Sequence, residues 1–511
     1  MDPESLGVRD SDLVRAGLAI GVAILAIIVL FPGIRYKGGL VNNKKPFELS
    51  WTNAKRRFQS GARGLITTAF NQNDGKHKDA FYMVTDNGVE MIIHPKYAHE
   101  IRNDERFSIS AYNEQSFHGR IPGFEMFKEN VVEEQLFINA VRSRLTRSLG
   151  KLLGPISEEV TSALRQHWTD NKEWHSISLH SAVLPVIAQQ SSRVFLGEEL
   201  CHNADWMRIT VNHTVSFFMA VEALRVWPKI LRPLAARFSP MCKNLRAEIE
   251  EARRIITPIL ENRRAQQQAH SKHAASTRPN DLIEWLEETA DGRSYDAARA
   301  QLKISVAAIH TTSDLLTQTL FNIADKPALI QDLRKEIMST IGTHGWEKAA
   351  LYNLKLMDSV LKETQRLKPI SIGTMVRVTL DDVTLSDGLR IPKGTKTLVS
   401  CHNMWDKGIY DHADQFDGYR FYELRKLPGQ ENSSQLVSTS PDHFAFGHGL
   451  HACPGRFFAA AEVKITLCHI LLKYDIRLVG ERPNVIEHGV AQYANAWGQI
   501  EIKRREEEIA L

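Results

Sequence analysis

One stretch near the end of the chain limits the possible folds more than any other. From Phe446 to Gly455 it sets a lone cysteine, Cys453, among three glycines, and an apolar-rich run over 459–472 follows. Glycine suits tight bends and close backbone approach. Pro454 suits the first position of a helix, which would place Cys453 at a helix N-terminus, where thiolate is favoured. Such a thiolate suits axial ligation of haem iron, whereas the alternative is a turn with a buried structural cysteine.

The spacing of this stretch carries a family resemblance. Phe446, Gly449, Cys453 and Gly455 fit Phe-x-x-Gly-x-x-x-Cys-x-Gly. By this motif the chain resembles the microsomal cytochromes P450, and the resemblance covers almost the whole chain. It implies a mainly α fold with a small β-rich lobe. It also implies that haem b binds with Cys453 as the axial thiolate and metal ligand, beside Phe446, Gly449 and Gly455.

Composition excludes some classes of protein. Hydrophobic residues make up 43% and charged residues 24%, which is typical of a globular chain with a large core. The net charge of +4 and the absence of basic blocks argue against nucleic acid as a partner. Five scattered cysteines argue against a disulfide framework and for a reducing compartment.

The N-terminus differs from the rest. From Ala16 to Phe31 no residue is charged, and Leu13 and Val14 extend the apolar run around Arg15. A bilayer needs roughly 20 apolar residues, and tilt with snorkelling of Arg15 covers the shortfall. Basic residues follow the run, which predicts a cytosolic body. A cleaved signal peptide is the alternative, but it would need a basic start and an Ala-x-Ala site.

These features predict four segments and a location. They are a lumenal N-terminus over 1–12, a transmembrane anchor over 13–32, a linker over 33–60 and a haem-thiolate monooxygenase domain over 61–511. The expected location is the endoplasmic reticulum membrane, with a single pass and a cytosolic catalytic domain.

Hydrophobic periodicity predicts the order of elements. Phe81 to Ile93 predicts two short strands, and Phe107 to Glu129 has no steady period, which predicts a long loop. The pattern from Val131 to Arg264 is mostly helical. Further helices are predicted over 295–325, from 327, and over 354–367, with β-rich runs over 374–380 and 383–399.

A Glu/Arg pair lies ninety residues before the cysteine. Glu363 and Arg366 share a helix face, which by itself usually means a solvated pair. The resemblance places the family's Glu-x-x-Arg motif here. It also implies that Arg420, in a segment similar to the family's meander, joins both in a buried network. Their role would be structural, holding the loop beneath the haem.

The helix predicted over 295–325 carries Ala307-Ala308-Ile309-His310-Thr311-Thr312. The resemblance places this helix above the iron, where the two alanines leave room for dioxygen and Thr311 relays protons. His310 stands where the family usually has an acid, and a histidine can itself shuttle protons. Without the cysteine loop, the simpler interpretation of Thr311 and Thr312 would be that their hydroxyls bond to carbonyls of their own helix.

The resemblance also implies contacts to haem and substrate. Arg377 and His451 are the expected partners of the haem propionates. The family's Trp-x-x-x-Arg motif is absent, although Arg142 and Arg144 lie in the corresponding region. An apolar substrate pocket is expected, with walls from 107–117, 305–309, 370–375 and 493–497.

The predicted reaction is insertion of one oxygen atom from O2 into a hydrophobic small molecule. Electrons would come from NADPH through NADPH-cytochrome P450 reductase, with cytochrome b5 as a further partner. The wording of the motifs is similar to fungal ent-kaurene oxidases and secondary-metabolism enzymes, which favours terpenoid or polyketide-derived substrates. Alternatives are a reductase-independent haem-thiolate isomerase or peroxygenase, and a non-catalytic membrane haem protein.

Overall fold

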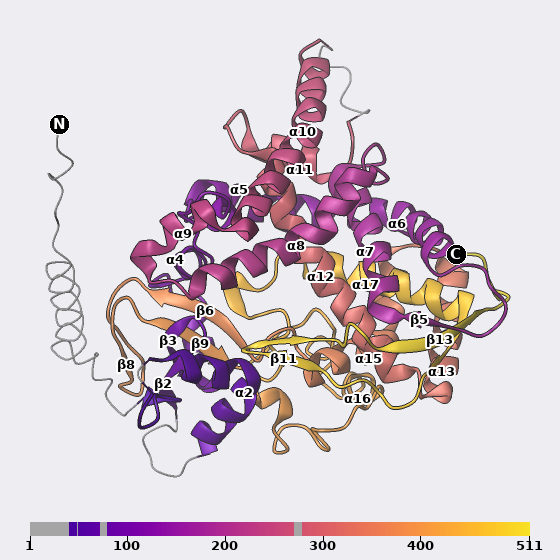
Figure 1. The fold of residues 1–511 in the computed structure, drawn as a ribbon. Coiled ribbons are helices and arrows are strands. Elements are labelled where there is room, and N and C mark those ends of the chain that lie inside the picture. Colours follow the sequence, from indigo (N-terminus) through magenta and orange to yellow (C-terminus); the bar gives the residue numbers. More distant parts are fainter. Residues whose placement is uncertain (1–39, 49, 72–78, 270–277) are drawn as a thin grey trace, which may run out of the picture.

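The computed structural model describes residues 40–48, 50–71, 79–269 and 278–511. Figure 1 shows a helical body with a smaller sheet at its lower left. The predicted lumenal segment 1–12 and anchor 13–32 lie outside the described residues. Within the described ranges, no helix has both the length and the apolar character needed to cross a membrane.

The predicted linker over 33–60 differs from the structure where the structure describes it. Strand β1 (Leu40–Val41) pairs in parallel with β2, and helix α2 (Thr52–Asn71) begins well before residue 61. Phe58, Ala62 and Ile66 recur every four residues and are buried in one cluster with strand residues. This apolar helix face needs a partner surface, so residues 52–60 of the predicted linker belong to a packed helix.

Helices build most of the molecule, as predicted from the periodicity over 131–264 and beyond. The six-residue segment Ala140–Leu145 continues α5 into α6 as a π-helix. The helices that follow α2 are α3 (Ala98–Ile101), α4 (Ile109–Ser116), α5 (Val131–Asn139), α6 (Thr146–His167), α7 (Leu179–Leu196), α8 (Ala204–Arg225), α9 (Arg232–Phe238), α10 (Pro240–Ala269), α11 (Leu282–Ala290), α12 (Ala297–Ile323), α13 (Pro327–His344), α14 (Lys348–Asn353), α15 (Lys355–Leu367), α16 (Arg420–Leu424) and α17 (Arg456–Lys473).

The strands form a small β-rich lobe and three minor pairings, which confirms the predicted mainly α class. The main sheet has the order β1-β2-β3-β9-β6-β4, and the others are β10-β13-β5, β11-β12 and β7-β8. The bounds are β2 (Ala80–Thr85), β3 (Gly88–Ile93), β4 (Phe107–Ser108), β5 (His175–Ser178), β6 (Gly373–Thr379), β7 (Val383–Thr384), β8 (Arg390–Ile391), β9 (Lys396–Ser400), β10 (Tyr474–Leu478), β11 (Ile486–His488), β12 (Ala491–Tyr493) and β13 (Gln499–Arg504).

The long loop predicted over 107–129 is wrong in its first half. Strand β4 pairs with β6, and α4 follows with Ser108 as its cap, which accepts a hydrogen bond from the Ala111 N–H at 3.0 Å. The buried side chains of α4 include Glu114 and Ser116 beside Tyr112. Because polar residues share the buried face, the helix shows no apolar period in the sequence.

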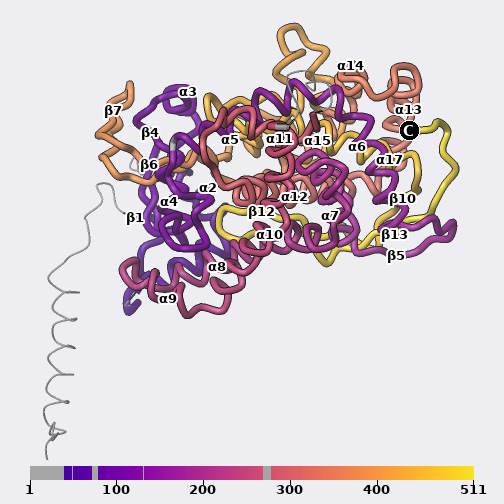
Figure 2. The backbone as a smooth tube through the Cα atoms, turned by 90° about the horizontal axis from the view of Figure 1, so that it is seen from above, coloured from indigo at the N-terminus to yellow at the C-terminus, as the bar shows by residue number. Residues whose placement is uncertain are grey.

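Helix α12 crosses the centre of the molecule (Figure 2) and packs against α7, α8, α10, α15 and α17. Asp296 caps its start by accepting from the Arg299 N–H at 2.9 Å, and Pro327 begins α13 soon after it ends. Most of its side chains are buried. A polar side chain on such a helix needs a hydrogen-bond partner or borders a cavity.

Candidate active site

The cysteine loop depends on glycine at two positions. Gly447 and Gly449 have φ of +70° and +75°, and a side chain on Gly449 would clash with Arg102. The Cys453 N–H donates to the Phe446 carbonyl at 2.8 Å, which closes the loop on itself. Helix α17 begins at Arg456, so the predicted helix start at Pro454 is two residues early.

The environment of Cys453 opposes ionisation of the free thiol. Burial raises its pKa, and the opposing effects of the Gly455 and Arg456 N–H groups and the Arg456 charge are smaller. The sequence predicted that the helix N-terminus would favour the thiolate, but in the structure this effect is smaller than the effect of burial. A bound metal ion supplies the missing positive charge, because coordination deprotonates a thiol.

A cavity of about 390 Å³ lies between the cysteine loop and α12, and we refer to it as the chamber. Cys453 lines it together with Thr311 of α12. Most of its wall is apolar, and the remaining polar lining includes Thr312, Asp314, Gln365 and Lys368. The apolar lining includes Phe137, Val141, Leu145, Ile304, Ala307, Ala308, Leu315, Ile370, Phe446 and Phe458.

A second cavity of about 400 Å³ shares Gly447 and His451 with the chamber. Its walls come from three of the four segments predicted to surround a substrate: parts of 109–117, 371–376 and Tyr493. The remaining segment, 305–309, contributes Ala307 and Ala308 to the chamber, whereas Trp497, at the end of the segment that begins with Tyr493, is 79% exposed and lines neither cavity.

Arg377 is a buried cation that needs an anion. Arg377 is 2% exposed, and its Nη1 donates to the neighbouring Val376 carbonyl at 2.7 Å. No carboxylate among the described residues pairs with it, and burial lowers its pKa to about 10. Arg377 and His451 both line the second cavity. This arrangement fits the carboxylates of a haem, with Cys453 as the donor to its iron.

Glu363, Arg366 and Arg420 form one buried cluster. Arg366 donates to both Glu363 oxygens at 2.8 Å, and Arg420 Nε lies 3.1 Å from each of them. Arg366 also donates to the carbonyls of Met404 and Ala413 at 2.6 and 2.8 Å. The cluster thus ties α15 to the chain segment that leads toward the cysteine loop.

The two polar residues predicted to move protons face different ways. Thr311 lines the chamber, and its hydroxyl donates back to the Ala307 carbonyl at 2.8 Å. His310 is absent from the chamber wall, and its Nε2–H donates to the Val211 carbonyl of α8 at 2.9 Å. The structure therefore places His310 in helix packing rather than beside Thr311 as a proton carrier.

Arg142 and Arg144, from the region where the family carries Trp-x-x-x-Arg, have partners within the protein. Arg142 donates to the Leu450 carbonyl at 2.8 Å, and Arg144 lies 3.4 Å from Glu288. Neither lines the chamber or the second cavity. Arg142 instead braces the cysteine loop.

Sequence reasoning missed the pair formed by Asp314 and Lys368 at the chamber wall. A signal for Asp314 existed, since it lies three residues after Thr311 and so shares its helix face. Lys368 gave no such signal, because its contact to α12 spans 54 residues of sequence.

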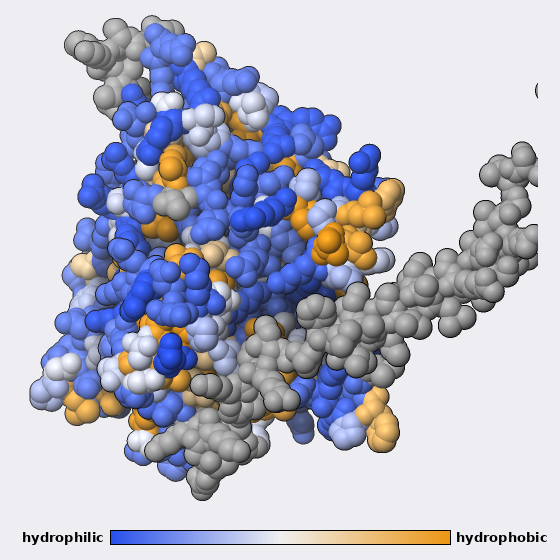
Figure 3. Space-filling model, turned by 90° about the vertical axis from the view of Figure 1, so that its left-hand side faces the viewer, coloured by the Kyte–Doolittle hydropathy of each residue, from blue (hydrophilic) through white to orange (hydrophobic). Residues whose placement is uncertain are grey.

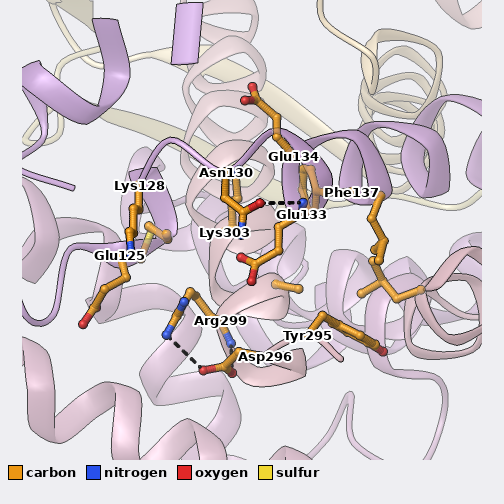
Figure 4. A pocket seen from close by; sticks show the side chains of 14 residues that line it. Glu125, Lys128, Asn130, Glu133, Glu134, Phe137, Tyr295, Asp296, Arg299 and Lys303 are labelled. Carbon is orange, nitrogen blue, oxygen red and sulfur yellow. Dashed lines mark hydrogen bonds and ion pairs between the residues drawn. The ribbon is translucent and has the colours of Figure 1, made fainter. Parts of the chain in front are cut away.

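A smaller cavity of about 40 Å³ borders the chamber at Phe137, which lines both. Figure 4 shows its charged side chains, with Glu133 and Asn130 on one side and Arg299 on the other. Lys303 lies 5.1 Å from the centre of the Phe137 ring. The cavity is small and charged, so it suits water rather than an apolar substrate.

The family model for cytochrome P450 matches residues 50–497. The chain belongs to the cytochrome P450 family. It is 54% identical to cytochrome P450 monooxygenase cle2 of Aspergillus versicolor, over 97% of this chain and 96% of that protein. It is also 47% identical to nodR of Hypoxylon pulicicidum and 43% identical to prhD of Penicillium brasilianum. These alignments cover 97% of this chain and 96% and 95% of those two cytochrome P450 monooxygenases.

Membership settles the class of chemistry. Cytochromes P450 bind haem iron through a cysteine thiolate, and this chain is a P450 monooxygenase. Haem bound in this way activates O2 for transfer of one oxygen atom to the substrate.

Replacing Glu363 by Gln should destabilise the protein strongly. The change leaves two buried guanidinium groups without their carboxylate, which costs about 3–5 kcal/mol. The matched control is Glu423→Gln, which breaks an exposed pair with Lys426 and should cost about 0–1 kcal/mol. Thermal denaturation followed by circular dichroism compares the two. Equal midpoints would contradict the role given to the cluster.

Replacing Arg377 by Gln should loosen haem. A hydrogen bond to a charged group contributes about 1.5–3 kcal/mol, so haem should leave roughly 10- to 100-fold faster. The rate of haem transfer to apomyoglobin measures this effect, with exposed Arg390→Gln as the control. Identical rates for the two variants would mean that Arg377 has another anionic partner.

Proposed function

We propose that this P450 oxidises a terpenoid or polyketide-derived secondary metabolite, with Cys453 as the axial haem ligand. The observation that carries the proposal is the chamber itself, because it brings Cys453 and Thr311 to one largely apolar cavity. Thr311 would hold the relayed proton at its hydroxyl. Arg377 and His451 would hold the propionates, and Phe446, Gly449 and Gly455 would shape the loop around sulfur.

The lining favours a lipophilic substrate. Ile304, Ala307, Ala308 and Ile370 offer no strong hydrogen-bond donor, so the chamber selects by shape and apolar area. Asp314 and Lys368 at the wall bind each other. Hydrocarbon frameworks such as diterpenes match such a surface.

We infer that NADPH-cytochrome P450 reductase, aided by cytochrome b5, supplies the electrons. Arg144, Arg147 and Lys151 form an exposed basic stripe across the junction of the π-helix 140–145 and α6. Thr146 of α6 and Phe457 of α17 line one hollow, so the stripe lies near the cysteine loop. An acidic partner docked there approaches the haem from the thiolate side.

An exposed apolar patch supports a membrane location. Side chains from the end of α8 to the start of α10 are exposed although they are large and apolar: Val226, Trp227, Ile230, Leu231, Leu234, Phe238 and Met241. Figure 3 looks onto the side where α9 lies in Figure 1 and shows a raised orange cluster among hydrophilic residues. Lys229, Arg232 and Arg237 are interspersed, as expected of a surface that rests on anionic lipid. Together with an anchor at 13–32, this patch favours the endoplasmic reticulum membrane.

Cells that express this chain with a reductase should convert some supplied diterpenes or polyketides into products heavier by one oxygen atom. Mass spectrometry of extracts detects them, and a Cys453→Ser strain is the control. The wild-type protein should show a strongly red-shifted Soret band when reduced and bound to carbon monoxide, and the variant should not. Products that persist in the variant strain would refute the assignment of Cys453.

The patch should enter lipid when the full chain is placed in a nanodisc. An environment-sensitive dye attached at Ile230→Cys should emit further to the blue than the same dye free in buffer. Ile230 is 87% exposed in the patch, so a dye at this position would enter the lipid. Tyr352→Cys, 50% exposed on α14, is the control and should keep a water-like emission. A water-like spectrum at both positions would exclude the patch from the membrane.

A further inference from the structure

The acid expected on α12 is present, but not at the expected residue. Helix α12 presents Thr311 and Asp314 to the same chamber, whereas His310 binds the Val211 carbonyl of α8. Residues three apart share a helix face, so the carboxylate of Asp314 lies next along the wall after the Thr311 hydroxyl. The acid therefore follows Thr311 in the sequence, at position 314, instead of preceding it at position 310.

Asp314 is held by two contacts. One carboxylate oxygen accepts the Ala494 N–H at 2.7 Å, and the other pairs with the ammonium of Lys368. The side chains of Asp314 and Lys368 are 9% and 3% exposed, and both line the chamber. A buried ion pair is costly to form, and a hydrophobic pair of similar volume would usually serve stability equally well.

We propose that the Asp314–Lys368 pair supplies the protons that Thr311 relays into the chamber. The inference rests on the monooxygenase chemistry and on the relay role proposed above for Thr311. In this proposal the pair, and not His310, is the source of the protons that reach Thr311.

The proton balance defines the step. Insertion of one oxygen atom consumes O2, two electrons from NADPH and two protons, and it releases one water. The Lys368 ammonium gives a proton through chamber water to the Thr311 hydroxyl, which passes its own proton on. Asp314 stays ionised, the neutral amine of Lys368 takes a proton from bulk water, and a second transfer by the same route supplies the second proton. No other oxidant or reductant is needed.

Other titratable groups lie close enough to the pair to feel its charges. His180 of α7 responds to the charges of both Asp314 and Lys368, while His310 and Tyr493 respond to Asp314. Burial lowers the pKa of Lys368, which Asp314 partly opposes. The ammonium therefore releases its proton more readily than one in water. His180 is half-buried.

The decisive variant is Asp314→Asn combined with Lys368→Met. It removes both charges, and the amide oxygen still accepts the Ala494 N–H, so the fold is preserved. The chain offers a close structural match as a control. Asp358 pairs with buried Lys464 at 2.6 Å and accepts the Leu436 N–H at 2.7 Å, but it does not line the chamber. Asp358→Asn therefore reports what losing a comparable buried carboxylate does elsewhere.

The first readout is the fate of oxygen in the haem-loaded protein with reductase and NADPH and no added substrate. The ratio of hydrogen peroxide to water should rise roughly 10-fold or more in the double variant, because a positioned proton donor typically contributes about 10²–10⁴ to a rate. The solvent deuterium isotope effect on NADPH oxidation should change as well. The single variants Asp314→Glu, which keeps the carboxylate, and Asp358→Asn should both show the wild-type ratio of hydrogen peroxide to water.

The second readout does not depend on turnover. The Soret band of the ferric protein, titrated from neutral to alkaline pH, should show a transition that the double variant lacks. In Asp314→Asn alone the transition should move to lower pH, since the lost carboxylate no longer raises the pKa of Lys368. An unchanged peroxide ratio in a double variant that keeps its carbon monoxide band would overturn this proposal alone. Failure of the wild type to reduce oxygen with NADPH would overturn the monooxygenase assignment too.

Discussion

The carboxylate of Glu363 is buried completely between two guanidinium groups, and the position of the cysteine loop depends on this contact. Each buried ion costs several kcal/mol in lost hydration, which only a fully bonded arrangement offsets. Arg366 meets that condition through the carbonyls of Met404 and Ala413, and Arg420 through Asp411. The segment after β9 therefore cannot shift without exposing a donor. It leads directly into the loop that carries the thiol.

The second constraint is the geometry of helix α12, which fixes the directions in which its polar side chains point. Consecutive residues point about 100° apart, and here Thr311 faces the chamber while His310 is turned toward α8. Asp314 lies between them in angle, which lets it border the chamber and still influence His310. The helix thus uses one polar face for packing on α8 and the neighbouring face for chemistry.

Local patterns predicted much of this fold, because the information lay close in sequence. The apolar period of α12, the Asp86-Asn87-Gly88 turn between β2 and β3, and the glycine spacing around Cys453 each act within a few residues. Helix α4 escaped prediction because its buried face includes Glu114 and Ser116, whose burial only distant partners explain. Lys368 escaped for the same reason, since nothing nearby indicates that its ammonium meets α12.

Two buried cations on the cavity walls differ in one respect that organises the site. Lys368 has its own carboxylate from α12, whereas Arg377 has none among the described residues. An unpaired buried guanidinium is tolerated when a ligand brings the anion, so Arg377 marks the side where the haem carboxylates belong. A paired ammonium needs no ligand, and burial lowers the pKa of Lys368, which makes its proton easier to release. The second cavity therefore has an anchoring side at β6, the chamber has a proton-supplying side at the junction of α12 and α15, and the thiol lies on the loop that borders both cavities.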